Sequence, residues 1–308
     1  MIKHLSSLLA GAALFVGAAA TAQTAPPSPA AAAPSSAATQ DADPALWVVK
    51  DKDTTIYLFG TVHVLKPGMT WFDEAVKSAF DASDTLVLEM VMPDMAAMQA
   101  LVTKFAVNSD SKTLTDKLPA ADRAAFTSAL TDLGAPAGAL DHYDPWFAAT
   151  ELALLPIMKL GYNPANGPEA VLTAAAKAAG KPVAGLETPE QQLGYLDGLP
   201  EDAQITFLDQ TVKDIPKASA EIDAMVADWA KGDPDALAKI MNDDLTMSAA
   251  LKKTLLTDRN ARWADWIATR MKTPGTVFIA VGAGHLAGAG SVQNDLAKQH
   301  LKATRIAY

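Results

Sequence analysis

The chain has 308 residues, half of them hydrophobic, with a formal net charge of −10 at pH 7 and no cysteine. Excess negative charge repels phosphates, which argues against nucleic acids and anionic membranes as partners. Without cysteine there are no disulfide bonds, so the core or a ligand must stabilise the fold.

The first 22 residues have the pattern of a secretory signal peptide. Lys3 gives a basic start, LSSLLAGAALFVGAAA is an apolar run that is short for a membrane span, and Ala20-Thr21-Ala22 is a small-residue cleavage site. No later apolar run reaches 18 residues, so the mature chain is expected to have no membrane span. We therefore expect a protein exported to the periplasm of a Gram-negative bacterium.

Residues 23–43 are rich in Pro, Ala and Ser and lack large apolar side chains. Such a segment cannot bury enough surface to offset its ordering entropy, and it is expected to be a disordered linker. Residues 44–308 then form the folded domain.

Hydrophobic patterns predict strands alternating with helices in this domain. LWVVK and TTIYLFG read as a hairpin, and further apolar strands are expected at 84–90, 181–188 and 276–285. Helices are expected at 70–83, with Thr70 as N-cap, over much of 93–140, and through most of 189–272. This order predicts a mixed α/β fold: a central mixed sheet flanked by helices, with a helical middle region.

Two of the predicted strands end in the same motif, Gly-x-x-His. The first copy has Gly60 and His63, and the second has Gly282 and His285. Glycine allows close approach of a ligand to the backbone, and a histidine held by a rigid strand suits a ligand or a general base. A single histidine of this kind is more often a core residue bonded to a carbonyl, but two copies favour a shared functional site.

Two other predicted strands end in Leu-Glu, at Glu89 and Glu187. A carboxylate at the end of an apolar strand needs a cationic partner, a helix N-terminus or a metal. Since ligands bind at the carboxyl ends of strands in open α/β sheets, the two glutamates and two histidines are expected to converge. They are a plausible ligand set for a divalent metal, although the sequence has no compact zinc motif.

A late helix adds Arg259 to this set. Stepping 100° per residue along 251–271 places Arg259 within an apolar stripe, with Asn260 at its edge and Asp258 on the opposite side. A guanidinium in an apolar face needs a carboxylate or an anionic ligand. Arg259 is therefore expected either to pair a site glutamate or to stabilise a developing oxyanion.

Two further features are assigned supporting roles. Tyr143, in the polar aromatic turn DHYDPW, is included with Gly60 and Gly282 as support for substrate or backbone. A methionine cluster is interpreted as adaptable core or groove lining rather than a metal site. Its members are Met90, Met92, Met95 and Met98.

Taken together, these motifs resemble the TraB/GumN family, which includes the TIKI membrane-tethered proteases. The similarity lies in TTIYLFGTVHVL, DTLVLEM, GYNPANGPEAVLTAAAKAAGKPVAGLETPEQQL, TDRN and VFIAVGAGHLAG, and it spans roughly residues 44–308. It implies a mixed α/β architecture shared more distantly with ChaN-like and erythromycin-esterase-like proteins. It also implies a site on His63, Glu89 and His285, with a divalent metal such as Mn²⁺ or Co²⁺.

Three functions follow as alternatives. The leading one is a periplasmic metal-dependent hydrolase, with a peptide as the expected substrate. His63, Glu89 and His285 would hold the metal, Glu187 would be a ligand or base, and Arg259 would stabilise the oxyanion. The second is a metal-free hydrolase in which a histidine activates water. The third is a non-enzymatic protein that keeps the pocket for binding. The sequence leaves the substrate and oligomeric state open.

Overall fold

A computed structural model of the chain describes residues 40–241 and 249–308. The expected signal peptide and residues 23–39 of the expected linker lie outside the described residues. At the last residues of the expected linker, β1 (Gln40–Asp41) pairs in parallel with β4 (Met69–Thr70). Backbone hydrogen bonds from Gln40 to Gly68 and from Ala42 to Thr70 extend this pairing, so residues 40–42 are part of the described fold.

A six-stranded mixed sheet is the centre of the fold, as predicted. Its strand order is β6-β5-β7-β3-β2-β8. Four strands are parallel to one another: β3 (Thr54–Thr61), β5 (Thr85–Met90), β6 (Val183–Glu187) and β7 (Gly275–Gly282). The expected hairpin joins β2 (Leu46–Lys50) to β3, and β8 (Thr304–Arg305) closes the other side of β2. The parallel strands therefore end at one common edge.

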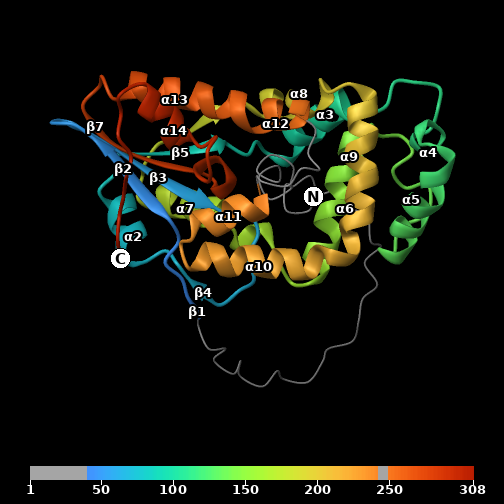
Figure 1. The fold of residues 1–308 in the computed structure, drawn as a ribbon, viewed down its shortest axis with the longest axis horizontal. Helices are drawn as coiled ribbons and strands as arrows, with labels where there is room; N and C mark the ends of the chain where they lie inside the picture. The colour runs from blue at the N-terminus through green and yellow to red at the C-terminus, as the bar shows by residue number, and fades with distance from the viewer. Residues whose placement is uncertain (1–39, 242–248) are drawn as a thin grey trace.

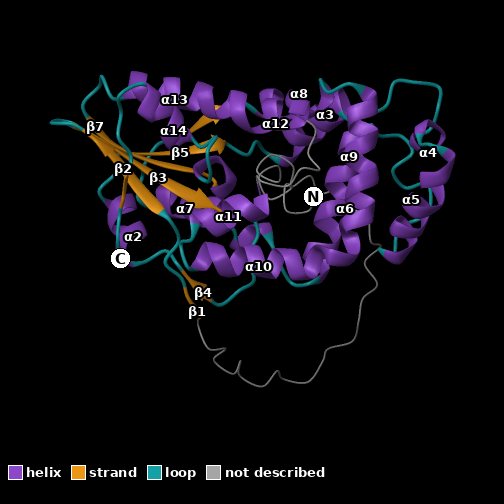
Figure 2. Ribbon diagram, in the orientation of Figure 1, coloured by secondary structure: helices purple, strands orange, loops and turns teal. Residues whose placement is uncertain are grey.

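Helices and short helical turns make up most of the remaining described chain (Figure 2). Their bounds are α2 Glu74–Asp81, α3 Met95–Phe105, α4 Leu114–Lys117, α5 Ala120–Asp132, α6 Pro145–Lys159, η1 Pro164–Asn166, α7 Pro168–Ala178, α8 Pro189–Asp197, α9 Glu201–Asp214, η2 Ile215–Lys217, α10 Ala218–Ala230, α11 Pro234–Met241, α12 Ala249–Lys252, η3 Lys253–Thr257, α13 Asp258–Arg270, η4 Ala283–Leu286 and α14 Val292–Lys298.

The two faces of the sheet bury different side chains. Ile56, Leu58, Val87, Val277 and Ile279 pack with α13 and α14 in one cluster. Phe59, Leu86, Leu88 and Phe278 belong to the larger cluster, which includes residues of α2, α6, α7 and α10. This alternation follows from the two-residue period of a strand, and it places helices on both faces of the sheet.

The predicted helical middle region forms a separate end of the molecule. In Figure 1 the sheet lies on the left, and α4, α5, α6 and α9 lie on the right. A buried tryptophan ties the long helices to the sheet: Trp229 of α10 donates from its indole nitrogen to the carbonyl oxygen of Gly60, at 2.7 Å. The end of β3 is thus fixed from below by the helical layer.

One predicted helix boundary was wrong. The helix expected from Thr70 begins at Glu74, with Asp73 in the N-cap position, because Met69 and Thr70 are drawn into β4. Local capping chemistry was outweighed by strand pairing with a segment far away in the sequence.

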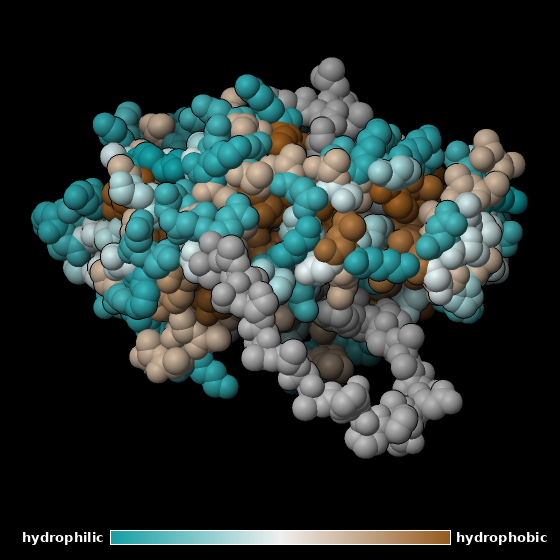
Figure 3. Space-filling view, turned by 90° about the horizontal axis from the view of Figure 1, so that it is seen from below, coloured by the Kyte–Doolittle hydropathy of each residue, from teal (hydrophilic) through white to brown (hydrophobic). Residues whose placement is uncertain are grey.

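The described residues contain no helix long and apolar enough to cross a membrane. On the face drawn in Figure 3, hydrophilic side chains dominate and hydrophobic ones show in separate patches between them.

Glu151 of α6 generates a test of this core. Its side chain is buried, 8% exposed, and burial raises the pKa of its carboxyl from 4.5 to about 8. The folded protein therefore keeps this proton to about pH 8, whereas the unfolded chain releases it near 4.5, so stability falls as the pH rises between these values. We expect Glu151→Gln to raise the free energy of unfolding at pH 8.5 by about 2–4 kcal/mol. Urea unfolding at pH 4 and pH 8.5 measures this.

The gain from Glu151→Gln should disappear at pH 4, where both states are protonated. The exposed Glu190→Gln is the matched control and should change little at either pH. An equal effect of Glu151→Gln at both pH values would contradict the account.

Candidate active site

The common edge of the parallel strands carries all four of the predicted histidines and glutamates. Gly60 pairs with Val281 and Thr61 with Gly282, so the two Gly-x-x-His motifs leave the sheet side by side. His63 follows β3 directly, and His285 lies in η4 after β7. On the neighbouring strands, Glu89 lies within β5 and Glu187 ends β6.

Arg259 occupies the middle of this group. It enters from α13 and is 3% exposed. Its Nη2 donates to Oε2 of Glu89 at 2.6 Å and to Oε2 of Glu187 at 2.7 Å, and its Nε reaches Oε1 of Glu187 at 3.0 Å. Burial alone would lower the pKa of Arg259, but the two carboxylates outweigh this and raise it. Arg259 thus remains charged and pairs with both glutamates, the first of its two predicted roles.

Two more side chains complete the hydrogen bonds of the carboxylates. Gln192 of α8 donates to Oε2 of Glu187 at 3.0 Å and, more weakly, to Oε2 of Glu89 at 3.4 Å. The indole nitrogen of Trp263 donates to Oε1 of Glu187 at 3.1 Å. Both oxygens of Glu187 are therefore occupied by Arg259 and these donors. Each oxygen of Glu187 accepts at least two of these hydrogen bonds, whereas Oε1 of Glu89 accepts only from the N–H of Gly282 among the described residues. This difference favours a supporting role for Glu187.

His285 is held as a neutral imidazole. It is fully buried, and its Nδ1 lies 2.5 Å from Oδ1 of Asn260, so Nδ1–H donates to the amide oxygen. Burial and the positive charge of Arg259 keep the pKa of His285 well below its ordinary value. Its Nε2 therefore presents a lone pair, 3.3 Å from Nη1 of Arg259 and 3.8 Å from Oε1 of Glu89.

His63 is held in the same tautomer by a residue that sequence reasoning missed. Its Nδ1 lies 2.7 Å from Oε1 of Glu169, near the start of α7, and the hydroxyl of Thr61 donates to the same oxygen. Burial lowers the pKa of His63, but the charge and hydrogen bond of Glu169 raise it more, so the net shift is upward. Burial raises the pKa of Glu169, and the paired His63 lowers it more. Nε2 of His63 is buried without a hydrogen-bond partner among the described residues.

Gly282 explains how closely these groups pack. Its N–H donates to Oε1 of Glu89 at 2.7 Å. A Cβ at this position would lie 3.1 Å from that oxygen and 3.2 Å from Nε2 of His63. Glycine therefore leaves room for the free nitrogen of His63 and orients Glu89 at the same time.

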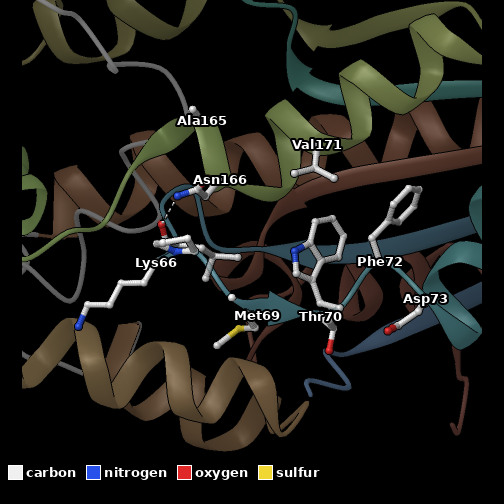
Figure 4. A pocket seen from close by; sticks show the side chains of 12 residues that line it. Lys66, Met69, Thr70, Phe72, Asp73, Ala165, Asn166 and Val171 are labelled. Carbon is white, nitrogen blue, oxygen red and sulfur yellow. Dashed lines mark hydrogen bonds between the residues drawn. The ribbon is translucent and has the colours of Figure 1, made fainter. Parts of the chain in front are cut away.

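The loop that carries His63 is fixed to η1. Leu65 and Asn163 exchange backbone hydrogen bonds, and the side chain of Asn166 donates to the carbonyl oxygen of Leu65 at 3.3 Å (Figure 4). A hollow of about 410 Å³ lies beside this loop, with Lys66 and Asp73 among its lining residues. The connection between β3 and α2 is thereby anchored to the segment around η1.

A larger cavity of about 540 Å³ has His63 and Glu169 in its wall. Most of its other lining residues are apolar and include Met90 and Met92. Of the predicted methionine cluster, these two line a cavity and Met98 lies in the core, whereas Met95 is exposed. The cavity therefore borders the His63–Glu169 pair.

The donor types around His63 fit the divalent cation that the resemblance implies. Both histidines donate from Nδ1 to an oxygen behind them, which turns each Nε2 towards Glu89 and Arg259. Nε2 of His285 faces Nη1 of Arg259 at 3.3 Å, and Glu89 accepts from Arg259 and from the N–H of Gly282, so a cation bound here would have to replace contacts of Arg259. The unpartnered Nε2 of His63 is the observation on which this fit rests. Within residues 40–241 and 249–308, no three histidine or acidic side chains are already gathered around one ion position. The metal prediction therefore stays a prediction.

The structure and the sequence prediction differ at three residues: one predicted residue lies outside the cluster, and two residues of the cluster were not predicted. Tyr143 pairs with Val107 and stacks on Phe147, at a ring distance of 4.6 Å, and no contact in the described chain links it to the site residues. Glu169 and Gln192 were not predicted. Glu169 follows Pro168 in the first turn of α7, where an acidic residue is ordinary for any helix.

The fold and site define a class: a mixed α/β protein in which strand ends present a buried His, Glu and Arg cluster. The sequence profile described as the TraB/PrgY/gumN family matches residues 45–305, so the chain belongs to that family.

Curated relatives extend this result without adding a function. The chain is 25% identical over 257 residues to "Uncharacterized protein YbaP" of Escherichia coli (strain K12) and to the protein of the same name in Shigella flexneri, covering 82% of this chain and 92% of each relative. An "Uncharacterized protein" of Treponema pallidum (strain Nichols) is 21% identical over 270 residues, covering 83% and 80%. No solved structure matches the chain.

Arg259→Met tests the charge balance of the cluster. It would leave two buried carboxylates without a cation, so we expect it to lower the free energy of unfolding by about 3–5 kcal/mol. Arg262→Met is the matched control, because Arg262 is half-exposed and lies 3.9 Å from Glu187. Its cost should stay below about 1 kcal/mol. Similar costs for the two variants in urea unfolding would argue against Arg259 as the central cation.

Gly167→Ala tests the approach of α7 to His63. A Cβ on Gly167 would overlap the carbonyl carbon and oxygen of His63, so the backbone must shift. We expect a loss of about 1–3 kcal/mol in stability and a changed ring environment for His63 in NMR. Gly194→Ala in α8 is the control, since its Cβ would meet no atom within 4 Å, and it should be neutral or stabilising.

Proposed function

We propose that the protein is a hydrolase that uses a divalent cation, with a peptide as substrate, and that it acts outside the cytoplasm. The observation that supports this most is the buried, unpartnered Nε2 of His63, beside a cavity large enough for a ligand. Export is supported by the sequence of residues 1–22. The relatives are uncharacterized, so the divalent cation and the peptide substrate are supported by the site and by the resemblance of the motifs described above.

His63, Glu89 and His285 would hold the cation. When bound, it would lower the pKa of water and polarise the carbonyl of the substrate. Glu169 keeps the proton of His63 on Nδ1, and Asn260 does the same for His285, so both Nε2 lone pairs stay turned to the site.

Arg259 and Gly282 fix the position of Glu89. Arg259 holds one oxygen of Glu89 in a buried ion pair. The N–H of Gly282 orients the other oxygen, which faces His285 at 3.8 Å. Because its guanidinium is bonded to two carboxylates, Arg259 is assigned the role of stabilising the site rather than that of binding a substrate oxyanion.

A metal-free hydrolase is the second candidate, and the His63–Glu169 pair favours it. An imidazole with a carboxylate behind Nδ1 can accept a proton from water at Nε2. Thr61 and Glu169 would then fix the ring in the required orientation.

The proposal is tested by metal content and peptide cleavage. The purified chain, treated with EDTA and then supplied with Mn²⁺, Co²⁺ or Zn²⁺, is incubated with a mixed peptide library, and products are identified by mass spectrometry. We expect cleavage that disappears with EDTA and returns with one metal. His63→Ala and His285→Ala should lower it by about 100-fold or more, and Glu169→Gln by about 10–100-fold.

His142→Ala is the matched control, because His142 is exposed and forms none of the hydrogen bonds described for the cluster. Cleavage that survives EDTA but requires His63 would favour the metal-free candidate. A protein that neither retains metal nor cleaves any peptide would contradict both, and would leave the non-enzymatic alternative.

A further inference from the structure

The cavity beside His63 has an ordered distribution of chemistry along α7. Glu169, Thr173 and Lys177 all line it, at positions i, i+4 and i+8, so they follow one face of the helix. Glu169 contacts His63 at the N-terminal end of this row, and Lys177 lies eight residues further on, about 12 Å along the helix axis. One side of the cavity thus runs from the candidate catalytic pair to an ammonium group.

The facing walls are apolar and adaptable. Leu88 and Met90 come from β5, Val91 and Met92 follow it, and Leu154 comes from α6. Val91 is 40% and Met92 49% exposed, so apolar side chains reach the rim as well as the interior. Unbranched methionines repack around ligands of different shape, which suits varied apolar groups.

Charge decides the direction in which a ligand lies. At the His63 end, the imidazole and the carboxylate of Glu169 are already paired with each other, whereas Lys177 is exposed and forms no ion pair within the described part of the chain. Lys177 is also the only lysine or arginine among the described residues that line the cavity. An anionic group is therefore expected at the Lys177 end, with the bond to be cut near His63.

The length of the row limits the ligand. An extended peptide rises by about 3.3 Å per residue, so about 12 Å corresponds to three or four residues. We propose that the cavity binds the last three or four residues of a peptide with apolar side chains, and that Lys177 holds its free C-terminal carboxylate. This substrate class rests on the proposed function for the cleavage step, but its binding can be measured separately.

Binding is tested with N-acetyl-Ala-Leu-Leu-Phe as the free acid and as the C-terminal amide. Affinities are measured by isothermal titration calorimetry on the full chain carrying His63→Gln, a substitution chosen to limit turnover. Mass spectrometry then shows whether the peptide stays intact. We expect the acid to bind about fivefold or more tightly than the amide. Lys177→Met should remove that difference and leave amide binding unchanged, whereas Lys298→Met, a surface control on α14, should preserve it.

A second variant tests the apolar walls. Ala174→Phe places a large side chain into the cavity from α7, and it should weaken both peptides by about tenfold or more with the unfolding temperature unchanged. Equal affinity for acid and amide, or equal loss of both with Lys177→Met, would overturn the proposal.

Cleavage separates this inference from the proposed function. If the acid binds as expected but the wild-type chain cuts neither peptide under any metal condition, the hydrolase proposal fails and the ligand assignment stands. If the wild-type chain cuts both peptides with the same kcat/KM and Lys177→Met changes neither, the hydrolase proposal stands and the ligand assignment fails.

Discussion

The buried ion network of Arg259 is the constraint on which the site depends. One guanidinium joins the ends of β5 and β6 through Glu89 and Glu187 and approaches His285 after β7. Two carboxylates at the carboxyl edge of a sheet would otherwise repel each other in a poorly hydrated place. With Arg259 present, the strands can end together and the histidines can stay neutral or paired beside them.

The helix that carries Arg259 is itself shaped for this position. This helix, α13, follows directly on a π-helical turn, η3, which ends at Thr257. Such turns frequently occur at functional sites. Its buried residues include Arg259, Asn260 and Trp263. Arg259 and Trp263 donate to Glu187, and Asn260 accepts from His285. Asp258 instead pairs with Lys253 at the surface, in agreement with its predicted place opposite the stripe. A single helix face thus supplies the cation, the amide behind His285 and an indole donor.

Much of the fold and the central cluster could be predicted because their signals are local. Apolar strands ending in Gly-x-x-His or Leu-Glu predicted a mixed sheet and the convergence of His63, Glu89, Glu187 and His285 at one edge of it, and helical periodicity predicted that Arg259 pairs with a glutamate there. Glu169 escaped notice because an acidic residue near a helix N-terminus is ordinary, and only the tertiary approach of α7 brings it to His63. Tyr143 was grouped with the site from its aromatic surroundings, but those surroundings are a packing contact with Phe147. The start of α2 was missed because β1 and β4 pair across the chain.

The central claim is that both histidines carry a proton on Nδ1 and turn Nε2 towards the site, where Nε2 of His63 has no partner among the described residues and Nε2 of His285 faces Arg259. Long-range ¹H–¹⁵N correlation spectra of the histidine rings, recorded at pH 7 with the five histidines assigned by substitution, measure this directly. The account predicts a neutral Nδ1–H ring for His285 that persists well below the pH at which an exposed histidine titrates, and an Nδ1–H bonded to Glu169 for His63. An Nε2–H tautomer for His285, or ordinary titration of both rings near pH 6.5, would contradict it.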